Sequence, residues 1–148
     1  MGVEIERKFL VKEELWNKVR PESGTRILQG YILSSPETVV RVRVHGEKGR
    51  ITIKGKTQGV SRSEFEYAIP KADAEEMLKE FCEAKIIKVR YELKIDRFVW
   101  EVDEFESPKK GLILAEIELT NENEEFAHPE WLGKEVSHLP EYYNVNMI

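Results

Sequence analysis

The sequence has little that would send the protein out of the cell or into a membrane. A single cysteine, Cys82, allows no internal disulfide, which fits a reducing compartment. No apolar run approaches the roughly 18 residues that a membrane-spanning helix needs, and no apolar signal region is present near the N-terminus. We therefore expect a cytoplasmic protein with no membrane partner.

Internal repeats, low-complexity tracts and linkers are also absent. The 148 residues therefore predict one domain over 1–148, long enough for a real core. The three histidines have no partner at metal-ligand spacing, which argues against a zinc-type site. The net charge of −5 argues against a general affinity for nucleic acid, so we expect no nucleic-acid partner.

The chain does contain a series of short alternating runs, separated by turn-forming Gly, Pro and Ser. These runs predict eight strands joined mostly by hairpin-length turns, and hence a mainly antiparallel sheet. We expect the strands over residues 2–11, 25–33, 39–45, 50–56, 62–70, 86–93, 97–105 and 112–120. Helices are expected over 12–19, from an N-cap at Asp73 to residue 83, near 122–127, and from 140 towards 148.

The polar positions of these strands are charged, in blocks of mostly one sign. Arg41 and Arg43 alternate with valines, whereas Glu64 and Glu66 alternate with aromatic residues. A flat, open sheet would simply expose such a face to water. A surface adapted only for solubility intersperses the two signs, however. Similar blocks recur at Glu4, Glu6 and Lys8, at Lys54, at Lys88 and Arg90, at Glu101 and Asp103, and at Glu116 and Glu118.

The expected helices have apolar sides, and the apolar strand faces are their natural partners. The pattern therefore favours an α+β fold in which eight antiparallel strands close into a β-barrel, with helices packed on the outside and the charges inside. Burying so many charges dry would be prohibitive, so this interior must hold water, metal ions or an anion.

The two signs of charge suggest what the interior binds. Clustered Glu and Asp oxygens suit hard cations such as Mg²⁺ or Mn²⁺. Clustered Arg and Lys suit phosphoryl oxygens. Both in one cavity predict a site for a metal-bound polyphosphate.

Glu4-x-Glu6-x-Lys8, within the run from Val3 to Val11, resembles the ExExK motif of the CYTH superfamily, the triphosphate tunnel metalloenzymes. The similarity continues in the expected order along nearly the whole chain. It includes Gln29-Gly30-Tyr31, Val40-Arg41-Val42-Arg43, Thr52-Ile53-Lys54, Glu64-Phe65-Glu66, Lys88-Val89-Arg90-Tyr91, Trp100-Glu101-Val102-Asp103 and Ala115-Glu116-Ile117-Glu118.

This resemblance implies a metal-dependent enzyme that hydrolyses a triphosphate inside its tunnel. The implied metal ligands are Glu4, Glu6, Asp103, Glu116 and Glu118. The implied catalytic set adds Lys8, Glu64 and Glu66 to those five. The implied phosphate-binding residues are Lys8, Arg41, Arg43, Lys54, Arg62, Lys88 and Arg90, with Arg62 included because it shares the face of Glu64 and Glu66.

The compact chain and its Gln29-Gly30-Tyr31 motif are most similar to prokaryotic members associated with inorganic triphosphate. We therefore expect tripolyphosphate to be cleaved to diphosphate and phosphate, with Mg²⁺ or Mn²⁺ as cofactor. The alternatives are a thiamine or nucleoside triphosphatase, a class IV adenylyl cyclase and a non-catalytic triphosphate-binding module. The family also suits a homodimer, and we expect the segment around Tyr142 and Tyr143 to close one tunnel end.

Overall fold

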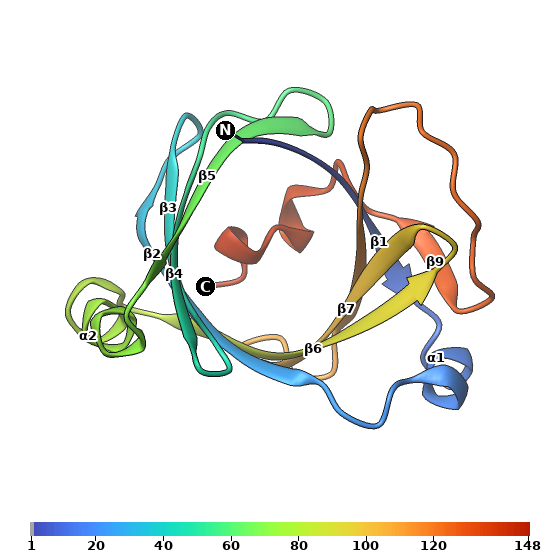
Figure 1. The fold of residues 1–148 in the computed structure, drawn as a ribbon, viewed down its shortest axis with the longest axis horizontal. Helices are drawn as coiled ribbons and strands as arrows, with labels where there is room; N and C mark the ends of the chain where they lie inside the picture. The colour runs from blue at the N-terminus through green and yellow to red at the C-terminus, as the bar shows by residue number, and fades with distance from the viewer. Residues whose placement is uncertain (1) are drawn as a thin grey trace.

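An eight-stranded antiparallel barrel forms the body of the molecule, as the alternation predicts (Figure 1). In the computed structural model, which describes residues 2–148, the strands lie side by side in the order β5-β4-β3-β2-β6-β7-β8-β1, and pairing of β1 with β5 closes the ring. The strands are β1 (Val3–Val11), β2 (Thr25–Ser34), β3 (Val39–His45), β4 (Lys48–Lys54), β5 (Ser61–Ile69), β6 (Lys85–Ile95), β7 (Phe98–Ser107) and β8 (Ile113–Glu118).

Strand β1 closes the barrel because it has three partners. One of its edges pairs with β8, from Glu6 opposite Glu118 to Leu10 opposite Leu114. The other edge pairs first with β5, through residues 3–5, and then with a ninth strand, β9 (Leu132–Glu135). The sequence did not predict β9, because its four residues are too few to show an alternating pattern.

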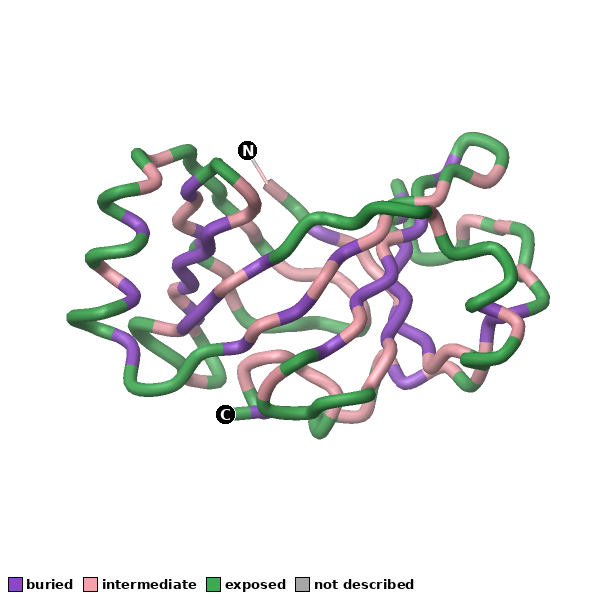
Figure 2. Tube along the Cα trace, turned by 90° about the horizontal axis from the view of Figure 1, so that it is seen from below, coloured by how far each residue is buried: buried purple, intermediate pink, exposed green. Residues whose placement is uncertain are grey.

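Helices α1 (Glu13–Val19) and α2 (Lys71–Phe81) pack on the outside, as expected. Helix α2 covers β2, β3 and β4, and buried positions recur along it (left in Figure 2). The prediction of Asp73 as its N-cap is wrong: the cap is Pro70, whose fixed φ suits the start of a helix, and Asp73 lies in the first turn. No helix in residues 2–148 is long and apolar enough to cross a bilayer.

The predicted helix over 122–127 is also wrong, because residues 122–123 form a turn and residues 124–127 have no regular secondary structure. The carboxylate of Glu124 accepts hydrogen bonds from the backbone N–H and the hydroxyl of Thr120, at 2.7 and 3.0 Å. Such bonds from side chain to backbone compete with a helix. The expected C-terminal helix is two short 3₁₀ turns, η1 (Pro140–Tyr142) and η2 (Asn144–Asn146).

The apolar core is divided between the outside and one end of the barrel. Outside, Trp16 of α1 packs with Trp100 and Trp131 in one cluster, while Ala74 and Leu78 of α2 pack on β3 in another. A third cluster gathers at the end where β1, β7 and β8 meet the C-terminal segment. It consists of Ile86, Phe105, Leu114, Val136 and Met147, with Tyr142 packed against it. The expectation that this segment closes one end of the tunnel is confirmed (Figure 1).

Candidate functional site

A cavity of about 930 Å³ lies inside the barrel. Strand alternation aims the charged side chains inward because successive residues point to opposite faces. All but one of the predicted site residues line this cavity, the exception being Asp103, which is buried behind it. The lining residues are Glu4, Glu6, Lys8, Arg41, Arg43, Lys54, Arg62, Glu64, Glu66, Lys88, Arg90, Glu116 and Glu118.

Carboxylates gather in one part of the cavity, where β1 lies between β5 and β8. Burial, together with the nearby charges of Glu116 and Glu4, raises the pKa of Glu6 well above its ordinary value. Burial and a hydrogen bond with Glu4 raise the pKa of Glu64 to about 7. Burial and the charge of Glu4 also raise the pKa of Glu118. The carboxylates are thus crowded enough to resist ionising together.

Lys54 supplies the cation of this acidic group. Its ammonium donates to both carboxylate oxygens of Glu4, at 3.1 and 3.3 Å, and lies 3.4 Å from Glu64. Burial opposes the ionisation of Glu4, but Lys54 and a hydrogen bond with Glu64 together leave the pKa of Glu4 below its ordinary value. Within residues 2–148, no three acidic or histidine side chains converge closely enough to form a ready-made metal site. The donor set still fits a hard cation, because it consists of oxygens whose mutual repulsion a cation would relieve.

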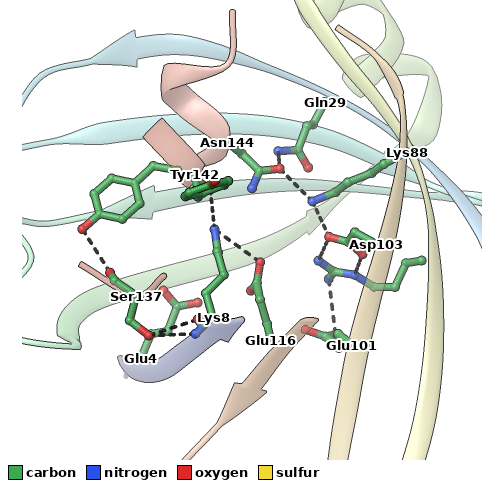
Figure 3. Close-up of polar contacts among 12 residues, drawn as sticks. Glu4, Lys8, Gln29, Lys88, Glu101, Asp103, Glu116, Ser137, Tyr142 and Asn144 are labelled. Carbon is green, nitrogen blue, oxygen red and sulfur yellow. Dashed lines mark hydrogen bonds and ion pairs between the residues drawn. The ribbon is translucent and has the colours of Figure 1, made fainter. Parts of the chain in front are cut away.

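Basic residues gather next to the acidic group. Arg90 donates to both oxygens of Asp103, at 2.8 and 2.9 Å, and the Lys88 ammonium lies 2.7 Å from the same carboxylate (Figure 3). Burial would raise the pKa of Asp103, but Arg90 and Lys88 hold it well below its usual range. The structure therefore places Asp103 among the cations, with both of its carboxylate oxygens bonded to them.

Other cations in this region lie farther from a carboxylate than Arg90 and Lys88 do. Lys8 lies 3.6 Å from Glu116, and its ammonium donates to the backbone carbonyl of Tyr142 at 3.0 Å. Arg41 donates to the Thr52 hydroxyl at 3.1 Å and lies 3.4 Å from Glu66, while its buried Nε has no partner among the described residues. An orphaned buried donor of this kind is suited to an anionic ligand.

Arg62 lines the cavity, but its guanidinium is occupied elsewhere. Its Nε and Nη2 donate to the backbone carbonyl of Gly55, at 3.0 and 2.7 Å. The bonds fasten β5 to the end of β4, so Arg62 is brought to the site with its Nε and Nη2 already bonded, whereas Arg41 uses only its Nη2.

Two polar residues at the site, Gln29 and Asn144, were not assigned a role from the sequence. Oε1 of Gln29 accepts hydrogen bonds from Nε and Nη2 of Arg43, and Nε2 of Gln29 donates to the Tyr31 hydroxyl at 3.0 Å. Asn144, from η2, accepts from Lys88 at 2.9 Å. Strand parity could have found Gln29, which shares the inward face with Tyr31. Nothing in the pattern around Asn144 could have placed it inside a barrel.

The fold and this site define a class of protein, a closed antiparallel barrel whose charged interior matches a polyphosphate and a hard cation. Residues 2–145 match the CYTH domain, and the chain belongs to the CYTH family. It is 44% identical to the inorganic triphosphatase of Acetivibrio thermocellus over 149 aligned residues, which cover 100% of this chain and 94% of the relative.

Solved structures of other proteins have the same fold. A crystal structure of an inorganic triphosphatase superposes with a TM-score of 0.65 at 28% identity, covering 97% of this chain and 96% of that one. A protein from Pyrococcus horikoshii superposes with a TM-score of 0.59 at 21% identity, covering 80% of each chain. The second likeness shows that the same fold persists at low sequence identity.

Proposed function

We propose that this protein is a divalent-metal-dependent triphosphatase that cleaves inorganic tripolyphosphate to diphosphate and phosphate. One observation carries the proposal: a single cavity holds crowded carboxylates beside buried arginines that lack full compensation. Relatives named inorganic triphosphatase, one of them 44% identical over the whole chain, support it.

In this proposal the cations bind the substrate. Arg41, Arg43, Lys88, Arg90 and Lys8 hold phosphoryl oxygens, with the arginines able to donate two bonds each. Lys54 and Arg62 extend this set towards the loop at the start of β5. Asp103 keeps Lys88 and Arg90 in position, because both of its oxygens are bonded to them.

The carboxylates Glu4, Glu6 and Glu118 are proposed to hold the metal, with Glu116 beside them. Bound there, Mg²⁺ or Mn²⁺ would neutralise phosphate charge and lower the pKa of a water. Glu64 and Glu66 are proposed to orient the attacking water, whose oxygen bonds to the terminal phosphorus as the bridging P–O bond breaks. Diphosphate leaves with the electron pair of that bond, and a neighbouring carboxylate accepts the proton of the water.

The test is phosphate release from tripolyphosphate, ATP and thiamine triphosphate in parallel, with Mg²⁺, Mn²⁺ or a chelator. We expect fast, metal-dependent release from tripolyphosphate, and its loss in Glu4→Gln with the fold unchanged. The matched control is Glu14→Gln, because Glu14 is exposed on α1. Faster release of phosphate from ATP or thiamine triphosphate than from tripolyphosphate would show that the substrate is an organic triphosphate.

A binding module without turnover is the second candidate, since the basic residues alone could capture a triphosphate. Tight binding of tripolyphosphate with no release under any metal would favour it. The presence of Glu4, Glu6 and Glu118 in one cavity favours catalysis, because a pure binder has no need of a metal set.

The cytoplasmic location, the absence of nucleic-acid and membrane partners, and the homodimer stay predictions. The single cysteine and the lack of a long apolar run support the cytoplasmic location and the absence of a membrane partner. The net charge of −5 supports the absence of a nucleic-acid partner. For the homodimer, the support is an apolar outer face on β4 and β5, where Ile53, Phe65 and Tyr67 are exposed.

A further inference from the structure

Arg43 is held by a neutral residue rather than by a carboxylate. Its Nε and Nη2 both donate to Oε1 of Gln29, at 2.8 and 2.6 Å. Arg43 is 7% exposed and Gln29 is fully buried. Within residues 2–148, no carboxylate lies within ion-pair distance of this guanidinium. Arg43 is thus oriented firmly while its charge is left in place.

Lys88, which lies on β6, also has a neutral hydrogen-bond partner. Its ammonium donates to Oδ1 of Asn144 at 2.9 Å, in addition to its contact with Asp103 (Figure 3). Nε2 of Gln29 lies 3.5 Å from the same Asn144 oxygen, so Gln29 and Asn144 form one neutral unit between the two cations. The unit joins β2 to the C-terminal segment.

A neutral oxygen and a carboxylate can both orient a cation, but only the carboxylate cancels its charge. Arg90 shows the second case, because Asp103 binds it through two bonds. Around Arg43 the charge persists: burial, together with the cations Arg41 and Arg90, lowers its pKa to about 9. A ligand with several negative charges would relieve this repulsion.

We propose that Gln29 and Asn144 are positioning residues whose lack of charge is itself functional. They aim Arg43 and Lys88 into the cavity without cancelling any positive charge, so that Arg43 keeps its charge for a polyphosphate chain and Lys88 shares its charge with Asp103 alone. This inference rests on the proposed function for the identity of the ligand. It adds that the two side chains must be both present and neutral.

Gln29→Glu is the sharpest test, because it exchanges an NH₂ group for an oxygen and keeps the acceptor for Arg43. We would titrate tripolyphosphate into wild type, Gln29→Ala and Gln29→Glu by calorimetry with chelator, and measure KM and kcat with Mg²⁺. We expect affinity to fall in the order wild type, Ala, Glu, with Glu about tenfold or more weaker than wild type. The thermal midpoint of Gln29→Glu should stay at or above that of wild type, because the new carboxylate pairs with Arg43.

A purely structural role gives another order. If Gln29 only held Arg43 in place, Gln29→Glu would bind like wild type and Gln29→Ala would be the weaker variant, and this result would overturn the inference. If wild type itself neither binds nor hydrolyses tripolyphosphate, the proposed function fails and removes the ligand on which the inference depends.

Asn144 provides an independent pair of variants on a partly exposed segment, where folding is at less risk. We expect Asn144→Asp to raise KM for tripolyphosphate more than Asn144→Ala does, with kcat changed less. Asn17→Asp makes the same change of charge on the exposed side of α1 and should leave KM unchanged. Equal KM values for Asn144→Asp and wild type would contradict the proposal.

Discussion

At the scale of single residues, the barrel interior tolerates charge where a buried carboxylate pairs with a specific cation. Asp103 is the extreme case, with 1% exposure and three short bonds to Lys88 and Arg90. Taking one partner from a buried ion group is far more costly than removing an exposed pair, because the remaining charges stay in a low dielectric.

We therefore expect Asp103→Asn to lower the free energy of unfolding by about 3 kcal/mol or more at pH 7. Because the folded-state pKa of Asp103 is depressed, its contribution is present above the ordinary value near 3.8 and is lost as the pH falls further. Urea unfolding at pH 7 measures the change. Glu101→Gln is the control, since Glu101 also pairs with Arg90 but its side chain is 38% exposed. Equal losses in the two variants would contradict the argument.

Glu64 gives the opposite dependence on pH. Burial and its hydrogen bond with Glu4 raise its pKa from about 4.5 to about 7, so the folded state keeps a proton that the unfolded chain releases. The stability linked to this proton is complete below pH 4.5 and is lost as the pH rises through 7. In chelator, the thermal midpoint of wild type should fall from pH 5 to pH 8 by a few degrees more than that of Glu64→Gln. Parallel curves would show that Glu64 titrates normally.

Sequence patterns predicted the charged residues of the cavity and missed the neutral ones. Arg43 and Lys88 stand out because they belong to blocks of mostly one charge sign on alternating strands. Gln29 and Asn144 are ordinary polar residues, and their importance depends on which cation they meet across the barrel. Such pairing depends on strand order and on the path of the C-terminal segment, and neither can be read from local alternation.

At the scale of elements, the strands were predictable because they alternate, and all but β2 have one charged and one apolar face. The predictions failed where the sequence shows no alternating or helical pattern. Strand β9 is only four residues long, and near the segment over 122–127 the backbone N–H of Thr120 donates to the side chain of Glu124. Helix α2 was found by its apolar side, although its first residue was misplaced. Short elements fixed by tertiary contacts carry little local signal.

The contact of α2 with the barrel explains the glycine in the Gln29-Gly30-Tyr31 motif. A Cβ at Gly30 would lie 2.7 Å from Cβ of Cys82 and 2.9 Å from its Sγ, closer than atoms can pack. We expect Gly30→Ala to cost about 1–3 kcal/mol of unfolding free energy, because the end of α2 must move outward. Chemical denaturation of Gly30→Ala, Cys82→Gly and the double variant tests this. The cost of Gly30→Ala should shrink in the Cys82→Gly background, and an unchanged cost would place the strain elsewhere.

At the scale of the whole molecule, closure of the barrel keeps the charged faces together. Eight expected strands, seven of them with the same alternating charged design, predicted that closure, but the sequence could not show how the ring is completed. It is completed by three residue pairs between β1 and β5 and by a C-terminal segment that packs into one end. The same segment carries Asn144 and the Tyr142 carbonyl to Lys88 and Lys8.

This arrangement makes the stability of the barrel end and the placement of the basic residues depend on one apolar anchor, Met147. Met147 is 6% exposed among Phe105, Leu114 and their neighbours, whereas the adjacent Ile148 is 45% exposed. We expect Met147→Ala to lower the free energy of unfolding by about 2 kcal/mol or more, and Ile148→Ala to change it little. Because loosening this segment also loosens its bonds to Lys8 and Lys88, only Met147→Ala should raise KM for tripolyphosphate. A Met147→Ala variant that loses stability but keeps its KM would show that the anchor and the basic residues act independently.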